Sequence, residues 1–422
     1  MDSLKIIVAH PGKQLSYKMA SAFKKSGNLL RYCTTIYNKE NAFAIKVLKK
    51  VKPFGIAASV KKKKNPDLED GEVTLYRTFP AVLEAILYRI EKSKKLYTAL
   101  QQRNAKKFGR KVAELAIKEG ADAVVCYDSN AFECFRVLKK KAPNITRIME
   151  VSHCARPYEK RLVEEEVARS GSNGLKKENF FLWNKSFMKN MQTEIDLADY
   201  FLTPSSFINN SLVACGVDPD KLVTVLYGSN TVAIEHEYQA EGPLRLLFVG
   251  NVNYNKGIPY LLKAMERFSA EEVTLRLVGL YNPKDEFVKN NTLKNVEFCG
   301  KLDFEEVCNI YRNSDVLVLN SFAEAMGQVG IEAMTCGLPI ICSTNTGVQD
   351  IVTDGENGFI IEPGDADALA EKILWFKENR KEIERMGRKA TKVGKACSWE
   401  TYEQDINKKL LPLIRKSRGH KA

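Results

Sequence analysis

Short apolar runs alternate with amphipathic segments along most of the chain. The runs are rich in Val, Ile and Leu, and they predict strands at residues 5–9, 123–127, 147–151, 200–203, 223–227, 245–249, 274–278, 296–299, 316–319 and 340–342. Continuous apolar runs of this kind are typical of parallel strands that are buried on both faces. Between them, apolar positions at helical spacing predict helices such as Tyr260–Phe268 and Phe304–Asn313. Strands that alternate with helices indicate an α/β fold with doubly wound sheets.

The length and one irregular stretch suggest two domains. The chain has 422 residues, which exceeds the usual size of a single domain. Residues 229–243 lack clean periodicity and end in Gly242-Pro243, after which a new strand begins. We therefore predict domains at residues 1–240 and 244–397 that face each other across a cleft. Ligands of open α/β sheets bind at the carboxyl ends of the strands, so a ligand is expected between the two domains.

The positive charge is concentrated in the first domain. The whole chain has a formal net charge of +13, and residues 1–240 carry 40 Lys and Arg against 26 Asp and Glu. Such a domain favours an anionic partner, which could be a phosphorylated substrate, an acidic membrane leaflet or nucleic acid. No nucleic-acid-binding motif accompanies the charge, so we predict no nucleic acid partner and favour an anionic membrane surface or substrate. A solvated lysine-rich surface is the alternative for any single run.

The stretch from Phe79 to Gly120 has no strand pattern. Apolar residues recur at helical spacing with Lys and Arg between them, which predicts helices that carry a basic face. Core packing explains the apolar positions. The basic face could also rest on anionic lipid.

Several classes of protein do not fit the sequence. No window approaches the roughly 18 apolar residues of a membrane span, and the start lacks the pattern of a secretory signal. Ten cysteines are scattered without a Cys-x-x-Cys pair, which favours free thiols in a reducing compartment. The four histidines lack metal-ligand spacing, so we expect no metal site. These features predict a cytoplasmic protein that could lie peripherally at the membrane.

The segment after the predicted strand 316–319 carries the most chemical information. A loop with Glu324 and Gly327 leads into a short helix that ends at Gly337. The start of this helix offers free backbone N–H groups for phosphate, and Gly327 allows close approach of the backbone. Glu324 and Glu332 can accept hydrogen bonds from hydroxyls on either side, as a nucleotide-sugar would require. The alternative is that both are ordinary surface acids.

This Glu-x7-Glu segment resembles the signature of retaining glycosyltransferase family 4, which has the GT-B fold of two Rossmann-like domains. Further segments resemble the family in the same order, and they lie at residues 198–205, 216–217, 227–228, 247–257, 296–300, 346–365 and 398–414. The resemblance implies a retaining transfer of a sugar from a UDP- or GDP-sugar to an acceptor hydroxyl, without cofactor or essential metal. It also implies that a C-terminal helix at 398–416 returns to the first domain.

The resemblance assigns roles to individual residues. As catalytic residues it implies Glu324 for the transferred sugar, Lys256 for the diphosphate, and His153 at the end of a strand of the first domain. It implies a wider donor-binding set of Glu332, Met326, Gly327, Gln328, Val329, Gly250, Asn251, Gly12 and Lys301.

One residue departs from the family pattern. The family often has an Arg where this chain has Asn251, which removes one cationic contact to the diphosphate. Either another basic residue substitutes, or the donor affinity or the type of donor differs. We expect a glycan or lipid-linked acceptor in bacterial-type polysaccharide or glycolipid synthesis. The alternatives are a GT-B sugar-nucleotide epimerase or phosphorylase, and a non-catalytic sugar-nucleotide-binding protein.

Overall fold

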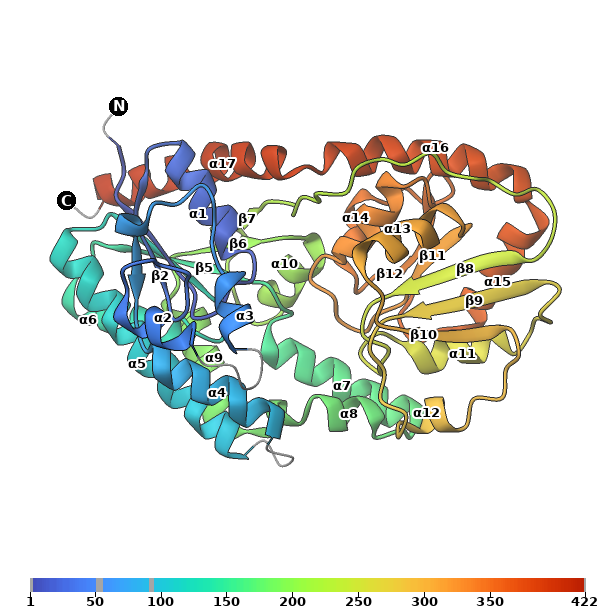
Figure 1. Ribbon diagram of the computed structural model, residues 1–422, viewed down its shortest axis with the longest axis horizontal. Coiled ribbons are helices and arrows are strands. Elements are labelled where there is room, and N and C mark those ends of the chain that lie inside the picture. Colours follow the sequence, from blue (N-terminus) through green and yellow to red (C-terminus); the bar gives the residue numbers. More distant parts are fainter. Residues whose placement is uncertain (1–2, 51–55, 91–94, 421–422) are drawn as a thin grey trace.

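The computed structural model describes residues 3–50, 56–90 and 95–420, and it contains two parallel sheets (Figure 1). The first sheet has the strand order β3-β2-β1-β4-β5-β6-β7, and the second has the order β10-β9-β8-β11-β12-β13. In each, the first strand lies inside the sheet, with the second and third on one side and the fourth on the other, which is the Rossmann order. The predicted α/β class with two doubly wound sheets is therefore confirmed.

The first sheet forms the core of the N-terminal lobe. Its central strand β4 is buried at all five positions, as expected for a strand covered by helices on both faces. The strands β2 and β3 were not predicted, and β7 is shorter than the predicted run 223–227, so that Tyr227 lies on a loop. The strands are β1 (Ile6–Ala9), β2 (Leu29–Thr34), β3 (Val73–Leu75), β4 (Ala123–Tyr127), β5 (Thr146–Glu150), β6 (Tyr200–Thr203) and β7 (Leu222–Thr224).

Helices cover both faces of this sheet and extend below it in Figure 1. The helices predicted between residues 79 and 120 are α4 and α5, and residues 91–94 between them lie outside the described residues. The helices of this lobe are α1 (Ser16–Lys25), α2 (Phe43–Leu48), α3 (Ile56–Lys61), α4 (Thr78–Ile90), α5 (Lys95–Glu119), α6 (Phe132–Lys141), α7 (Arg156–Ser170), α8 (Gly174–Glu178), α9 (Lys185–Leu197) and α10 (Ser206–Val213).

The second sheet forms the core of the C-terminal lobe. Its strands are β8 (Leu244–Val249), β9 (Val273–Val278), β10 (Val296–Gly300), β11 (Val316–Leu319), β12 (Ile340–Ser343) and β13 (Gly358–Ile361). The edge strand β13 was not among the predicted strands, and it pairs with β12 in the parallel direction. The helices are α11 (Ile258–Met265), α12 (Glu286–Lys289), α13 (Phe304–Arg312), α14 (Gln328–Thr335), α15 (Ala366–Glu378), α16 (Arg380–Ala396) and α17 (Trp399–His420).

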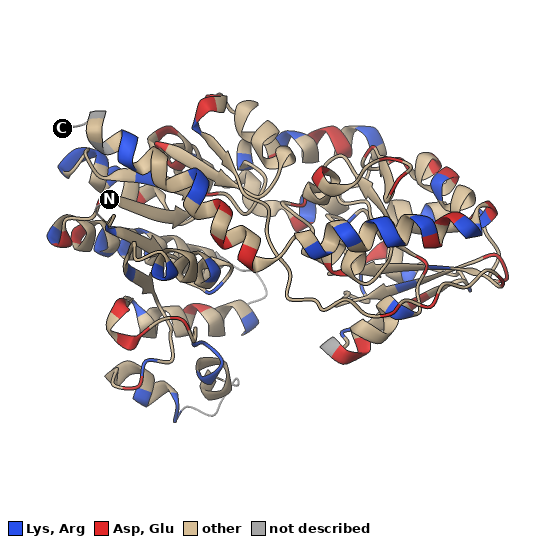
Figure 2. Cartoon of the chain, turned by 90° about the horizontal axis from the view of Figure 1, so that it is seen from above, with Lys and Arg blue, Asp and Glu red and all other residues tan. Residues whose placement is uncertain are grey.

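The last two helices join the lobes along one side of the molecule (red in Figure 1). Helix α16 packs on the core of the C-terminal lobe, whereas α17 places Tyr402, Ile406 and Leu410 in the core of the N-terminal lobe. The chain crosses between the lobes beside Gly228, where an added Cβ would lie 2.4 Å from the backbone carbon of Ser398. Seen from above, the two lobes are distinct, and both termini lie at the N-terminal lobe (Figure 2).

Helices α7 and α8 form a second connection, on the opposite side from α17 (Figure 1). Arg169 of α7 donates a hydrogen bond of 2.8 Å to the carbonyl oxygen of Gly364 in the C-terminal lobe. A small apolar cluster mixes Val163 and Leu175 from these helices with Phe322 from the C-terminal lobe. The carboxyl ends of the two sheets are therefore held facing each other at both sides.

Candidate functional site

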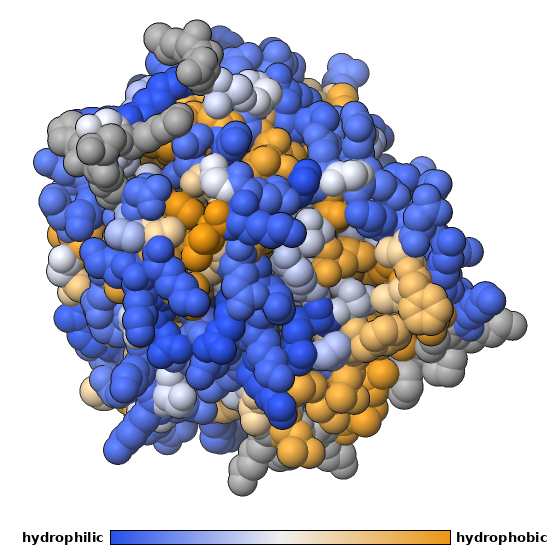
Figure 3. All heavy atoms as spheres, turned by 90° about the vertical axis from the view of Figure 1, so that its left-hand side faces the viewer, coloured by the Kyte–Doolittle hydropathy of each residue, from blue (hydrophilic) through white to orange (hydrophobic). Residues whose placement is uncertain are grey.

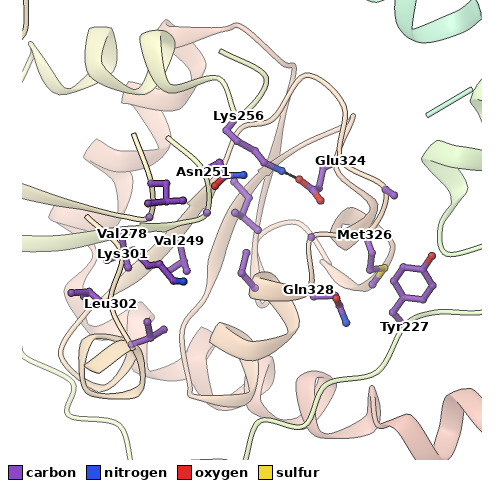
Figure 4. Close-up of a pocket in the computed structure, with 18 of the residues that line it drawn as sticks. Tyr227, Val249, Asn251, Lys256, Val278, Lys301, Leu302, Glu324, Met326 and Gln328 are labelled. Carbon is purple, nitrogen blue, oxygen red and sulfur yellow. Dashed lines mark ion pairs between the residues drawn. The ribbon is translucent and has the colours of Figure 1, made fainter. Parts of the chain in front are cut away.

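A cavity of about 580 Å³ lies between the lobes at the carboxyl ends of the strands (Figure 4). Most of its wall comes from the C-terminal lobe, and Ser152 and Tyr227 contribute from the N-terminal lobe. Nine of the twelve predicted site residues line this cavity, and they are Gly250, Asn251, Lys256, Lys301, Glu324, Met326, Gly327, Gln328 and Val329. The predicted residues Gly12, His153 and Glu332 are not part of its lining.

The side chains of Lys256 and Glu324 meet inside the cavity, where they form an ion pair (Figure 4). Burial lowers the pKa of Lys256 to about 8. The site therefore holds one cation and one anion in contact, close to the start of α14.

Hydrogen bonds between two loops bring this pair together. The loop before α11 carries Lys256, and the loop after β11 leads to Glu324. The backbone N–H of Phe322 donates to the carbonyl of Asn255 at 2.9 Å, and the amide of Asn320 donates to the carbonyl of Gly257 at 2.8 Å. Gly257 has a φ of +69°, and an added Cβ would lie 2.2 Å from the carbonyl oxygen of Asn320, so only glycine fits there.

The start of α14 faces the same cavity. Gly327 precedes the helix with a φ of +76°, and it has no side chain with which to cap the helix. The first N–H groups of a helix have no acceptor within the helix, so this end is suited to an anion. The side-chain amide of Gln328 reaches across the cleft and donates to the carbonyl of Gly228 at 3.1 Å. This contact ties the helix start to the point where the chain crosses between the lobes.

Glu332 lies on α14, just over one turn beyond Gln328. Its carboxylate accepts a hydrogen bond of 3.2 Å from the hydroxyl of Tyr311 on α13. Burial raises the pKa of Glu332, and the hydrogen bond from Tyr311 opposes that rise. Tyr311 was not foreseen, because an aromatic residue on an amphipathic helix is usually a core residue.

On the N-terminal side, His153 contacts an acid that the sequence reasoning missed. Its Nδ1 lies 2.9 Å from the carboxylate of Asp128, which also accepts a 2.8 Å hydrogen bond from the hydroxyl of Ser152. Burial alone would raise the pKa of Asp128, but the charge and hydrogen bond of His153 hold it at about 2. Asp128 follows β4 and His153 follows β5, and these strands are neighbours, so adjacency at the sheet edge was the available signal.

Gly12 lies on the loop after β1, where its N–H donates to Nδ1 of His10 at 2.8 Å. His10 is buried and packs edge-on against Tyr127, with ring centroids 4.9 Å apart. Burial lowers the pKa of His10 to about 4, so its ring is neutral at pH 7. This loop is built around a neutral histidine that accepts a backbone hydrogen bond.

Two further acids accept hydrogen bonds near the junction of the lobes. The hydroxyl of Tyr227, in the cavity wall, donates to the fully buried Glu150, whose pKa is raised well above its usual value by burial. Glu178 of α8 accepts hydrogen bonds from the N–H groups of Tyr254 at 2.8 Å and Asn255 at 2.9 Å, and also from the amide of Asn255. An acid of the N-terminal lobe thus holds the loop that carries Lys256.

Comparison with known proteins agrees with this architecture. Residues 233–393 match the family model described as Glycosyl transferases group 1. An uncharacterized glycosyltransferase of Methanocaldococcus jannaschii is 32% identical over 165 residues, which cover 38% of this chain and 46% of that relative. The chain thus spans about half of the length of the curated relatives that it matches.

Solved structures match almost the whole chain. Sucrose-phosphate synthase from Thermosynechococcus elongatus has a TM-score of 0.66 at 18% identity, covering 98% of this chain and 100% of that one. Anabaena HepE in complex with UDP-glucose has a TM-score of 0.59 at 14% identity, covering 96% of this chain and 99% of that one. The predicted GT-B fold is therefore confirmed.

The described residues form neither a metal cluster nor a membrane-spanning helix. Among them, no group of three or more His, Cys, Asp or Glu side chains is placed to hold a metal ion. No helix in the described part of the chain is both long enough and apolar enough to span a bilayer.

Proposed function

We propose that this protein is a retaining glycosyltransferase of family 4 that transfers a sugar from a nucleotide-diphosphate sugar to an acceptor hydroxyl. The observation that carries the proposal is the cavity in which Lys256, Glu324 and the start of α14 converge between two Rossmann-like lobes. The match of residues 233–393 to a glycosyltransferase family model supports it. So does the likeness in fold to HepE, whose structure contains UDP-glucose.

In this proposal the diphosphate lies against the start of α14. Lys256 and the N–H groups of the first turn stabilise the negative charge that develops on the leaving phosphate oxygen. Lys301 lines the same cavity and is the second cation available to the donor, which offers a substitute for the arginine that Asn251 replaces. Glu324 exchanges its contact with Lys256 for the hydroxyls of the transferred sugar, and Glu332 binds the ribose.

The reaction takes place at the face of the cavity formed by the N-terminal lobe. The acceptor oxygen bonds to the anomeric carbon on the side from which the diphosphate departs, and the acceptor proton passes to the departing phosphate oxygen. His153 adjoins Ser152, which lines this wall, and the Asp128 carboxylate fixes the orientation of the His153 ring. The acceptor is a glycan or a lipid-linked glycan intermediate, and the basic N-terminal lobe supports an anionic or membrane-borne one.

Substitution of the central pair tests the proposal. Lys256→Ala and Glu324→Ala should each reduce transfer from the preferred donor about a hundredfold or more, which is typical for removal of one transition-state contact. Lys263→Ala, on the exposed side of α11, is the matched control and should retain full activity. Thermal shifts with UDP- and GDP-sugars would identify the donor beforehand, because a bound ligand raises the apparent stability.

The outcomes separate the possible functions. Wild-type transfer rates in both variants would refute the assignment of the site. Sugar conversion without an acceptor would identify an epimerase, and a requirement for inorganic phosphate would identify a phosphorylase. Binding of a donor without turnover across a broad panel of acceptors would identify a binding protein.

A further inference from the structure

Exposed apolar side chains gather on one face of the N-terminal lobe. On α2, Phe43 is 77% exposed, and on α4, Leu83 and Ile90 are 49% and 58% exposed. Single exposed apolar side chains are common, but a group of large ones on neighbouring helices marks a surface that a partner covers. We call this surface the α2–α4 face, and it comprises Phe43, Val47, Phe79, Leu83, Tyr88, Ile90 and Leu96 at the start of α5.

The helices of the α2–α4 face form one continuous layer. Ile45 and Leu48 of α2 pack with Val60 of α3 in a small buried cluster, and Val82 of α4 packs against the same cluster. The inward side chains therefore hold the three helices together, while the apolar residues named above point outward. Figure 3, which views this end of the molecule, shows apolar side chains gathered near its lower edge and bordered by hydrophilic ones.

Most of the described lysines around these residues form no ion pair with an acid. Residues 43–64 contain eight lysines and no Asp or Glu. Of the residues that the structure describes, Lys46, Lys50, Lys61 and Lys62 form no ion pair with an acid, whereas Lys64 pairs with Glu40 at 3.5 Å. The one acid of α4, Glu84, is turned inward and accepts a hydrogen bond of 2.9 Å from the amide of Asn104. The outward side of these helices is therefore apolar and cationic.

We propose that the α2–α4 face docks on a bilayer surface that contains anionic lipids. Apolar side chains mixed with flexible lysines are the composition that binds the boundary between headgroups and acyl chains. A symmetric dimer through the same face would bring the unpaired lysines of two copies together, which opposes self-association. The docking deepens the proposed function, since it supplies the membrane on which a lipid-linked acceptor would be presented.

The position of this face suits delivery of an acceptor to the cleft. Lys63 follows α3, and its carbonyl accepts a 2.7 Å hydrogen bond from the N–H of Asn38 in the loop after β2. Lys63 is close enough to Lys13 for their charges to interact, and Lys13 adjoins Gly12 on the loop after β1. The lysines beside the α2–α4 face therefore reach the carboxyl edge of the first sheet, where the acceptor side of the cavity begins.

Vesicle co-sedimentation of the full chain tests the docking without any donor or acceptor. The vesicles contain either phosphatidylcholine alone or equal parts of phosphatidylcholine and phosphatidylglycerol. We expect binding to the anionic vesicles that weakens with added salt, and little binding to the neutral ones. Lys61→Glu/Lys62→Glu should weaken the binding on the order of thirtyfold. Phe79→Glu/Leu83→Glu should weaken the binding by a similar factor, because this double substitution places charges where apolar side chains would meet lipid.

Matched controls distinguish the effect of the α2–α4 face on vesicle binding from the effect of net charge alone. Lys139→Glu/Lys140→Glu on α6 changes the net charge equally at two exposed lysines away from the face, and it should lower binding less than threefold. Circular dichroism would establish that each variant is folded. Glu324→Gln should bind vesicles like the wild type, so a failure of docking is distinguishable from a failure of the proposed activity.

Three results would overturn the proposal. The first is a wild-type protein that binds neither vesicle. The second is an equal loss of vesicle binding in the Lys139→Glu/Lys140→Glu control and the Lys61→Glu/Lys62→Glu variant. The third is a concentration-dependent dimer, measured by sedimentation velocity, that the Phe79→Glu/Leu83→Glu variant abolishes, because a second copy would then cover the face.

Discussion

Glu178 offers the sharpest test of how the two lobes build the donor site. This residue belongs to α8 of the N-terminal lobe, yet its carboxylate accepts three hydrogen bonds from residues 254 and 255 of the C-terminal lobe. The next residue is Lys256, the proposed diphosphate ligand. We therefore predict that Glu178 is a positioning residue, which acts on the reaction through the loop it holds.

The magnitude of a Glu178→Gln substitution follows from these contacts. One oxygen accepts from the N–H of Tyr254, and the other accepts from both the N–H and the amide of Asn255, each at 2.9 Å. Glutamine can keep one oxygen, but its NH₂ group would face donors at the other position. Leaving one buried donor unsatisfied costs about 1–3 kcal/mol, and here two partly buried donors of Asn255 would lose their acceptor. We therefore expect the free energy that holds Lys256 in place to fall by about 2–3 kcal/mol.

The loss should appear in catalysis more than in stability, because the contacts join two lobes and lie outside both sheet cores. We expect kcat/KM for the donor to fall roughly thirty- to hundredfold, since each 1.4 kcal/mol corresponds to a factor of ten. The melting temperature should change by only a few degrees. Steady-state kinetics with a varied donor and thermal unfolding would measure the two effects.

Glu165→Gln is the matched control for this prediction. Glu165 lies on α7, which precedes α8 in the second connection between the lobes, and its side chain is exposed. Glu165→Gln removes one negative charge, as Glu178→Gln does. The control should retain the kcat/KM of the wild type. If Glu178→Gln retained it as well, or lost activity only in proportion to unfolded protein, the positioning role would be refuted.

Two further substitutions address single groups of the site. Asn251→Arg places a cation in the cavity wall, and we expect donor affinity to rise about tenfold in a titration with the donor; an unchanged Kd would mean that the diphosphate does not reach this wall. His10→Asn should flatten the pH dependence of stability, because the folded protein binds the His10 proton only near pH 4 whereas the unfolded chain binds it near 6.5. Wild-type stability should therefore fall as the pH is lowered through this window, by about 2 kcal/mol at pH 5 in urea unfolding, and an identical slope in the variant would contradict this cause.

The fold could be predicted largely because its central strands are continuous apolar runs. Strands such as β4 and β11 are buried at every position, and such runs are visible in the sequence. β2 was missed because Arg31 interrupts its apolar pattern and pairs with Glu119 at the surface of the lobe. β3 was missed because it has only three residues, too few for a period to be recognised.

The candidate site was likewise predictable from the sequence only in part. The residues from Glu324 to Val329 are consecutive, and a strand, a loop and a helix start bring such residues to one place whatever the rest of the chain does. Asp128, Tyr311 and Glu178 contact His153, Glu332 and the Lys256 loop across gaps of many residues. An isolated Asp, Tyr or Glu gives no local sign of such a partner, so these residues required the structure.

The long-range contacts also explain why the short motif alone does not define the site. Two C-terminal segments that line the cavity are held by groups from the N-terminal lobe: Glu178 holds the loop before Lys256, and the carbonyl of Gly228 holds Gln328. The hydroxyl of Ser205 donates a 2.6 Å hydrogen bond to the carbonyl of Ala325, beside Glu324. A rotation of one lobe against the other would break these contacts together and separate the groups that meet in the cavity. The geometry of the proposed donor site therefore depends on the approach of the lobes as much as on the motif that first marked it.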